Sequence, residues 1–165
     1  MKLKKIISGG QIGADRAGLE IAKELGFETG GTVPKGYRTE NGPDLSLKEF
    51  GCVEHASSDW TPRTYANVSD SDATVIFGDV RSPGSRSTRD FCDLRGKPCL
   101  ANPTAYNLVV WLCVGEYEIL NVAGNRESTN PGIGEKVKQI LREALQSPGA
   151  QDGRLDPADG TRSGG

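Results

Sequence analysis

Short apolar runs that alternate with amphipathic helical patterns restrict the fold of this chain more than any other feature. The apolar runs predict strands over residues 4–8, 27–30, 52–55, 73–78, 98–101 and 118–123. Apolar residues at helical spacing predict helices over residues 14–25, 61–69, 85–95, 104–114 and 131–146. This repeating order predicts an α/β fold with a mostly parallel sheet that helices cover on both faces.

The segments that follow the predicted strands are the expected place for a ligand. Open parallel sheets bind ligands beyond the carboxyl ends of their strands. In this chain those segments are residues 8–11, 78–88, 102–103 and 121–126. Residues 32–44 are rich in Gly, Pro and polar side chains and predict a long loop, a feature that often carries function in compact domains.

The length of 165 residues suits one domain with a real core, followed by a tail. Residues 147–165 read SPGAQDGRLDPADGTRSGG, in which Leu155 is the single large aliphatic residue. Such a segment cannot bury enough apolar surface to offset the entropy lost on ordering. We therefore predict a ligand-binding domain over residues 1–147 and a disordered tail over residues 148–165.

Charge and composition exclude several classes of protein. The net charge of −2 gives no basic excess for non-specific nucleic-acid binding. No segment approaches the roughly 20 apolar residues of a membrane span, and the first apolar run is too short for a signal peptide. The four cysteines form no C-x-x-C pair, and Cys52 with His55 supplies only two metal ligands. These features predict a cytoplasmic protein with no metal site, nucleic-acid partner or membrane partner.

A glycine-rich turn follows the first predicted strand. Glycines between a strand and a helix allow a ligand to approach the backbone, and free N–H groups at the helix start favour an anion. The pattern is neither the G-x-G-x-x-G fingerprint nor a Walker loop. The alternative is a tight structural turn with a surface ion pair between Asp15 and Arg16. The candidate ligand-binding residues of this segment are Ser8, Gly9, Gly10, Gln11, Asp15 and Arg16.

Two further segments combine small residues with groups that bind anions. In the long loop, Lys35 and Arg38 flank Gly36 and could clamp a phosphate, or the loop could simply be solvated. Before the helix at 85–95, backbone amides and hydroxyl groups could form a second anion site. The alternative at this helix start is N-capping by Ser85 or Ser87. The candidate ligand-binding residues of this second segment are Gly84, Ser85, Ser87 and Thr88.

A polar segment precedes the predicted strand at 73–78. Asn67, Asp70 and Asp72 lie there and could bind a cation or polar groups of a ligand. The alternative is an Asx turn that joins the helix to the strand.

Taken together, these segments resemble one known family over residues 6–145. In order they read SGGQIGADRAGLEIAKELG, GGTVPKGYRTENGP, RTYANVSDSDATVIF, PGSRSTRDFCDLRGKP and LNVAGNRESTNPGIGEKV. The family is known as the putative molybdenum carriers, the circularly permuted YpsA-like branch of the Lonely Guy-like (SLOG) Rossmann superfamily. The resemblance implies a Rossmann-like three-layer sandwich, a homo-oligomer and a small phosphorylated ligand. The carrier name implies molybdenum cofactor, a phosphorylated pterin, as cargo.

The chain departs from the family pattern at two places and from the loop of related enzymes at a third. Ile12 stands where the family usually has Thr, and Pro83-Gly84-Ser85 stands where it usually has Gly-Gly-Thr. Related phosphoribohydrolases carry a P-G-G-x-G-T-x-x-E loop. When Thr88 is placed on the Thr of that loop, Phe91 falls at the position of the catalytic Glu.

Two main hypotheses about function follow. The first is a protein that binds or carries a nucleotide-like ligand, because anion-receptive loops occur without a complete catalytic set. The second is a nucleotide N-glycosidic hydrolase, for which Asp15 and Asp90 are the weak catalytic candidates. A third alternative is a scaffold whose pocket has lost its ligand.

Overall fold

Six parallel strands form the central sheet of the computed structural model, which describes residues 1–148 and 150 of the chain. The strands are β1 (Lys5–Ile7), β2 (Glu28–Val33), β5 (Cys52–Glu54), β6 (Ala73–Phe77), β7 (Cys99–Ala101) and β8 (Ile119–Gly124). Their order across the sheet is β5-β2-β1-β8-β6-β7. The predicted α/β fold with a parallel, Rossmann-like sheet is therefore confirmed.

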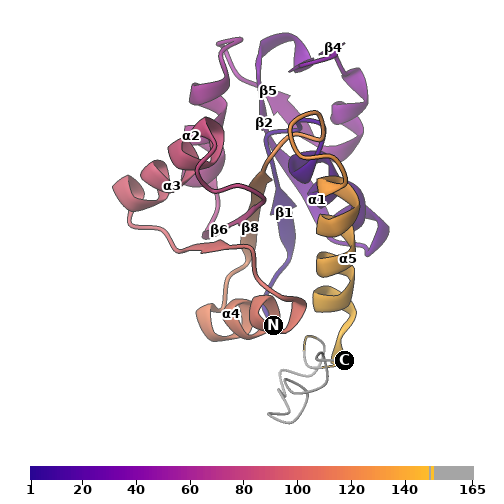
Figure 1. The fold of residues 1–165 in the computed structure, drawn as a ribbon. Coiled ribbons are helices and arrows are strands. Elements are labelled where there is room, and N and C mark those ends of the chain that lie inside the picture. The colour runs from indigo at the N-terminus through magenta and orange to yellow at the C-terminus, as the bar shows by residue number, and fades with distance from the viewer. Residues whose placement is uncertain (149, 151–165) are drawn as a thin grey trace.

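Five helices cover the two faces of this sheet (Figure 1). They are α1 (Ala14–Glu24), α2 (Trp60–Asp70), α3 (Pro83–Arg95), α4 (Ala105–Gly115) and α5 (Ile133–Gln146). Figure 1 shows α2 and α3 together on one side of the sheet and α1 and α5 on the other. Helix α4 shares a core with α1 and α5 through Leu108 and Leu112. This arrangement forms three layers.

The residue types of the central elements explain their burial. All five residues of β6 (ATVIF) are buried, as expected for a strand that is covered on both faces. Helix α1 buries Ala17 and Ile21 against the same core as Val137 and Leu141 of α5. These spacings of four residues place each pair on one helix face.

A glycine permits close packing between α1 and the sheet. A Cβ atom added at Gly18 would lie 2.8 Å from the Cβ atom of Val122 in β8, too close for normal contact. Gly18 therefore allows the start of α1 to approach the carboxyl end of β8, which brings two parts of the candidate site together.

The prediction of a long loop over residues 32–44 is wrong in part. Strand β2 continues to Val33, and the short turns η1 (Lys35–Tyr37) and η2 (Leu45–Phe50) follow it. Between these turns, β3 (Arg38–Thr39) and β4 (Gly42–Pro43) form an antiparallel hairpin. A second small core explains why this segment has a regular structure, because Leu47 and Phe50 pack against Leu19, Val33 and Cys52. Local periodicity did not indicate these distant apolar contacts.

The predicted tail lies almost entirely outside the described residues. Of residues 148–165, the structure describes Pro148 and Ala150, and the exposed fraction of Ala150 is 4%. Among all residues that are described, no helix has the length and apolar character needed to cross a membrane.

Candidate functional site

The topology of the sheet creates a crevice at the carboxyl ends of β6 and β8. The chain leaves β6 toward α3 on one face of the sheet and leaves β8 toward α5 on the other (Figure 1). Ligands of open α/β sheets bind where neighbouring connections diverge in this way. A cleft of about 480 Å³ lies here. Its lining comprises Gln11, Asp15, Trp60, Thr61, Arg63, Thr64, Ser82, Pro83, Gly84, Ser85, Ser87, Thr88, Ala123, Gly124, Asn125, Arg126 and Thr129.

The glycine-rich turn after β1 is held together by its own hydrogen bonds. The Ser8 hydroxyl donates to the carbonyl oxygen of Asp15 at 2.9 Å and accepts from the N–H of Gly10 at 3.2 Å. A Cβ atom added at Gly9 would lie 1.8 Å from Nη1 of Arg63, so the guanidinium group covers this backbone. The turn therefore contributes Gln11 to the cleft, whereas Ser8, Gly9 and Gly10 lie outside its lining.

A buried ion pair forms one wall of the cleft. Nη1 of Arg63 lies 3.4 Å from Oδ2 of Asp15, and their side chains are 13% and 7% exposed. Burial raises the pKa of Asp15, and the charge of Arg63 opposes that rise. Burial likewise lowers the pKa of Arg63, and Asp15 opposes that change. The N–H of Gln11 also donates to Oδ2 of Asp15, at 3.3 Å.

The start of α3 forms the opposite wall. The Ser82 hydroxyl accepts from the N–H of Ser85 at 3.4 Å and caps the helix, and Pro83 occupies the first turn. The Thr88 hydroxyl donates to the carbonyl oxygen of Gly84 at 3.0 Å. A Cβ atom added at Gly84 would meet nothing within 4 Å, so this backbone faces open space.

Three polar side-chain atoms of this cleft are buried without a hydrogen-bond partner in the described part of the chain. They are Oε1 of Gln11, Nε of Arg63 and Oγ of Ser85. The exposed fractions of Gln11 and Ser85 are 4% and 3%. Buried polar groups are normally paired, and a group without a partner costs roughly 1–3 kcal/mol. Of the five side-chain atoms of this kind among the described residues, these three belong to residues that line the cleft.

Asn125 connects the two loops that diverge at the sheet edge. Its Oδ1 atom accepts from the N–H of Asp79, and its Nδ2 atom donates to the Ser82 hydroxyl at 3.1 Å. The side chain thereby fixes the loop after β8 against the start of α3. Residues 121–126 were predicted as one of the segments near a ligand, but no residue of this segment was named as a candidate.

Two arginines pack on the indole ring of Trp60. The guanidinium carbon of Arg38 lies 4.3 Å from the ring centroid, and that of Arg126 lies 4.6 Å from it. Arg126 also lies near Glu40, with Nη1 and Oε2 3.7 Å apart. Cation–π contacts of this kind hold the long side chains at the rim of the cleft. Trp60 and Arg63 were not predicted, because no local motif marks the start of α2, whereas Arg126 lies in the segment 121–126 that was expected near a ligand but was not itself named as a site residue.

Several predicted residues bind other parts of the protein. Arg16 contacts Glu20 and Asp44 through Nε and Nη1, at 3.1 and 3.0 Å. Lys35 and Gly36 lie in η1, outside the cleft lining. Of the three residues predicted in this loop, Arg38 is the one that lies close to the cleft, through its contact with Trp60.

The residues predicted before β6 do not join the cleft. The amide of Asn67 pairs with the backbone N–H and C=O of Thr32, at 2.7 and 2.9 Å. Oδ2 of Asp72 accepts from the N–H groups of Glu118 and Ile119, at 2.9 and 2.8 Å. These two amides precede or begin β8, so Asp72 lies at the amino ends of the strands, opposite the cleft. Asp70 at the end of α2 lies toward the same end of the sheet.

Of the two predicted catalytic acids, one lines the cleft and the other does not. Asp15 lines the cleft, whereas Asp90 lies on the exposed surface of α3 and outside the lining. Within residues 1–148 and 150, no three His, Cys, Asp or Glu side chains are grouped to hold a metal ion.

Comparisons with known proteins agree with this architecture. Residues 6–145 match the model of the circularly permutated YpsA SLOG family, a stretch that includes every segment of the cleft. The chain is also similar to a crystal structure described as a putative molybdenum carrier protein from Syntrophus aciditrophicus SB. The two chains are 34% identical with a TM-score of 0.81, and the alignment covers 87% of this chain and 96% of the other. No curated protein matches.

Proposed function

The chain belongs to the circularly permutated YpsA SLOG family, and we propose that it binds a small phosphate-bearing ligand in the cleft between β6 and β8. The observation that carries this proposal is the set of three buried, unpaired polar atoms on Gln11, Arg63 and Ser85 among the described residues. Arg63 Nε and the Ser85 hydroxyl are donors that phosphate oxygens would satisfy. Oε1 of Gln11 is an acceptor and suits a hydroxyl or amine of the same ligand.

The electrostatics of the cleft favour an anion. The first turns of α1, α2 and α3 all contribute lining residues, so three helix N-termini converge on one cleft. Each N-terminus carries a partial positive charge. Arg126 adds a cation at the rim, with Glu40 3.7 Å from it, while Asp15 offsets the charge of Arg63. The sum is an excess of positive potential in which a phosphate group is stabilised.

The expected ligand is nucleotide-like, with molybdenum cofactor as the leading candidate. The cleft volume of about 480 Å³ lies within the range typical of small-molecule sites. A relative of known structure is described as a putative molybdenum carrier protein. Molybdenum cofactor would be bound as cargo, with its phosphate at Arg63 and Ser85.

A nucleotide N-glycosidic hydrolase is the second candidate, and Asp15 is the observation that favours it. Asp15 is the acidic residue that lines the cleft in the described part of the chain. A carboxylate near the sugar could stabilise the developing oxocarbenium ion. However, Asp15 already pairs with Arg63 and the N–H of Gln11, which holds the carboxylate away from general acid–base work. Binding without hydrolysis is therefore the first proposal.

The test combines the natural ligand with a defined panel. Mass spectrometry of the natively purified protein should find a phosphorylated small molecule. Calorimetry with nucleoside monophosphates and molybdenum cofactor should give a Kd well below about 1 mM for at least one compound. Chromatography of the same mixtures checks for a released base, which would favour the hydrolase. No binding below about 1 mM across the panel would contradict the proposal.

Ser85 and Ser69 provide a matched pair of variants for this test. Both hydroxyl groups are buried without a partner in the described structure, but only Ser85 lines the cleft. Ser85→Ala should weaken binding about tenfold, because a hydrogen bond to a charged group is lost. Ser69→Ala should leave the Kd unchanged.

A further inference from the structure

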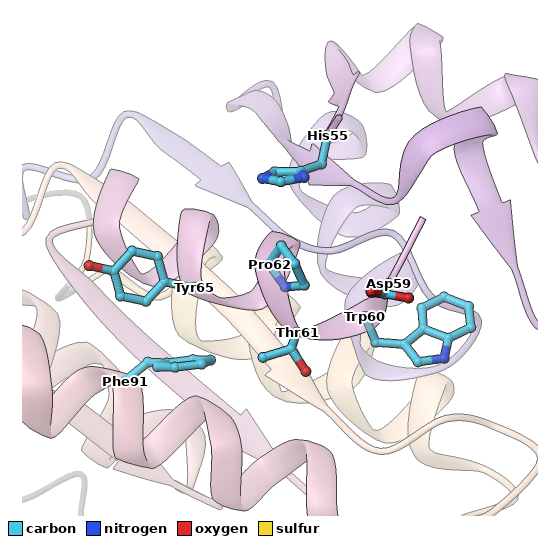
Figure 2. Close-up of a pocket in the computed structure, with 7 residues that line it drawn as sticks. All are labelled: His55, Asp59, Trp60, Thr61, Pro62, Tyr65 and Phe91. Carbon is cyan, nitrogen blue, oxygen red and sulfur yellow. The ribbon is translucent and has the colours of Figure 1, made fainter. Parts of the chain in front are cut away.

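A second hollow shares a wall with the phosphate cleft. It is a shallow hollow of about 640 Å³, open to solvent, and is lined by His55, Asp59, Trp60, Thr61, Pro62, Tyr65 and Phe91 (Figure 2). We call it the aromatic shelf. Trp60 and Thr61 line both the shelf and the cleft, so a single small molecule could occupy both.

Two aromatic rings form one end of the aromatic shelf. Tyr65 of α2 and Phe91 of α3 pack edge to face, with centroids 5.2 Å apart and planes at 83°. Figure 2 shows the two rings on one side of Pro62 and the indole of Trp60 on the other. Tyr65 remains 37% exposed. Aromatic surface left open beside an anion site is suited to stacking with a planar ring.

Polar groups at the rim of the shelf can form hydrogen bonds with the edge of such a ring. Nδ1 of His55 accepts from the N–H of Ser57 at 2.9 Å, which in the neutral imidazole places the proton on Nε2. Nε2–H is then a donor and the Asp59 carboxylate is an acceptor, and both residues belong to the lining of the shelf. A fused heteroaromatic ring presents both acceptors and amine donors along its edge.

We infer that the aromatic shelf holds the planar heteroaromatic ring of the ligand whose phosphate occupies the cleft. This inference rests on the proposed function and assigns a place to the ring of its ligand, a phosphate monoester that carries a fused nitrogen heterocycle. The ring stacks at Tyr65 and Phe91, and the linker to the phosphate passes Trp60 and Thr61, the wall that both hollows share. Pterin and purine rings both meet this description.

Matched probes separate the ring from the phosphate. Calorimetry with AMP, with GMP and with ribose 5-phosphate compares the same phosphate with and without a ring. AMP or GMP should bind about tenfold or more tightly than ribose 5-phosphate, since stacking on aromatic side chains contributes at this level. Replacement of Trp111 by Phe leaves Trp60 as the one tryptophan, whose fluorescence should change with each probe that binds.

Variants of the shelf complete the test. Tyr65→Leu combined with Phe91→Leu should bring AMP and GMP affinity down to that of ribose 5-phosphate, which itself stays unchanged. Tyr106→Leu is the matched control, because Tyr106 of α4 is also 37% exposed but lies outside both hollows. Circular dichroism confirms that the variants fold.

The outcomes distinguish the two levels of the proposal. Equal affinity for ribose 5-phosphate, AMP and GMP, unaffected by the double variant, overturns the aromatic shelf and leaves the phosphate cleft intact. No binding of ribose 5-phosphate or of either nucleotide overturns the cleft and the shelf together.

Discussion

Replacement of Arg63 by Met should leave the Asp15 carboxylate buried without its cation. Met retains the length of the apolar stem, so the change removes mainly the charge. Breaking a buried ion pair by removal of one partner costs about 3–5 kcal/mol. Arg63 borders the open cleft, so we expect the lower end, about 3 kcal/mol. With an m-value of about 2 kcal/mol/M in urea, the unfolding midpoint should fall by about 1.5 M.

The effect of pH follows from the direction of the pKa shift. Burial raises the pKa of Asp15, and Arg63 opposes that rise, so loss of Arg63 raises the pKa further. The folded variant then prefers the protonated acid. The free energy lost by burying the ionised Asp15 carboxylate is zero below the unfolded-state pKa of Asp15. This loss grows as the pH rises toward the folded-state pKa. The destabilisation should therefore be smaller at pH 5 than at pH 7.

Urea denaturation followed by circular dichroism measures this prediction. The double variant Asp15→Asn with Arg63→Met should recover most of the lost stability, since no charge stays buried. Arg81→Met is the control, because the ion pair of Arg81 with Asp79 is exposed, and it should leave the midpoint unchanged. The reasoning is refuted if Arg63→Met unfolds at the wild-type midpoint, or if the double variant is no more stable than the single one.

Three other substitutions test the structure around the cleft. Glu127 accepts hydrogen bonds from two backbone amides before and within the start of α5, which lower its pKa. This contribution is fully present above the unfolded-state pKa and is lost as the pH falls through the folded-state pKa, so Glu127→Gln should lower the melting temperature more at pH 7 than at pH 3. Asn67→Ala should cost about 2 kcal/mol in urea unfolding, because the half-buried backbone N–H and C=O of Thr32 both lose their partner. Asp72→Ala should reduce stability but leave nucleotide affinity by calorimetry unchanged, and a weaker affinity would contradict its place at the opposite edge.

The fold was predictable from the sequence because its signals are local. The buried run at residues 73–77 and the helical spacing of residues 133–146 appear as β6 and α5 nearly as expected. The segment at 45–50 was not predicted as an element. Its order depends on apolar contacts of Leu47 and Phe50 with residues that are distant in sequence.

The candidate site was predictable only where a loop follows a strand. Gln11 and Ser85 were identified from their positions after the first and central strands, and both line the cleft. Their role in ligand binding stays a prediction. Arg63 and Trp60 could not be found, because they lie at the start of α2, which reaches the cleft only through the crossover from β5 to β6.

The same limitation explains the different positions of the predicted acids. Asp72 and Asp15 both lie beside predicted strands, but Asp72 precedes its strand whereas Asp15 follows one. In a parallel sheet, that difference places Asp72 at the amino ends of the strands and Asp15 at their carboxyl ends. Once the sheet is known to be parallel, the position before or after a strand decides which residues can share a site.

The central claim is that a phosphate-bearing ligand binds in the cleft between β6 and β8. A titration of ¹⁵N-labelled protein with GMP, followed by amide chemical shifts, tests it most directly. The amides of residues 82, 84–88 and 123–126 should shift together with one Kd, while those of residues 118–120 at the amino end of β8 should not move. Unchanged spectra up to about 10 mM GMP, or the largest shifts around Asp72, would contradict the claim.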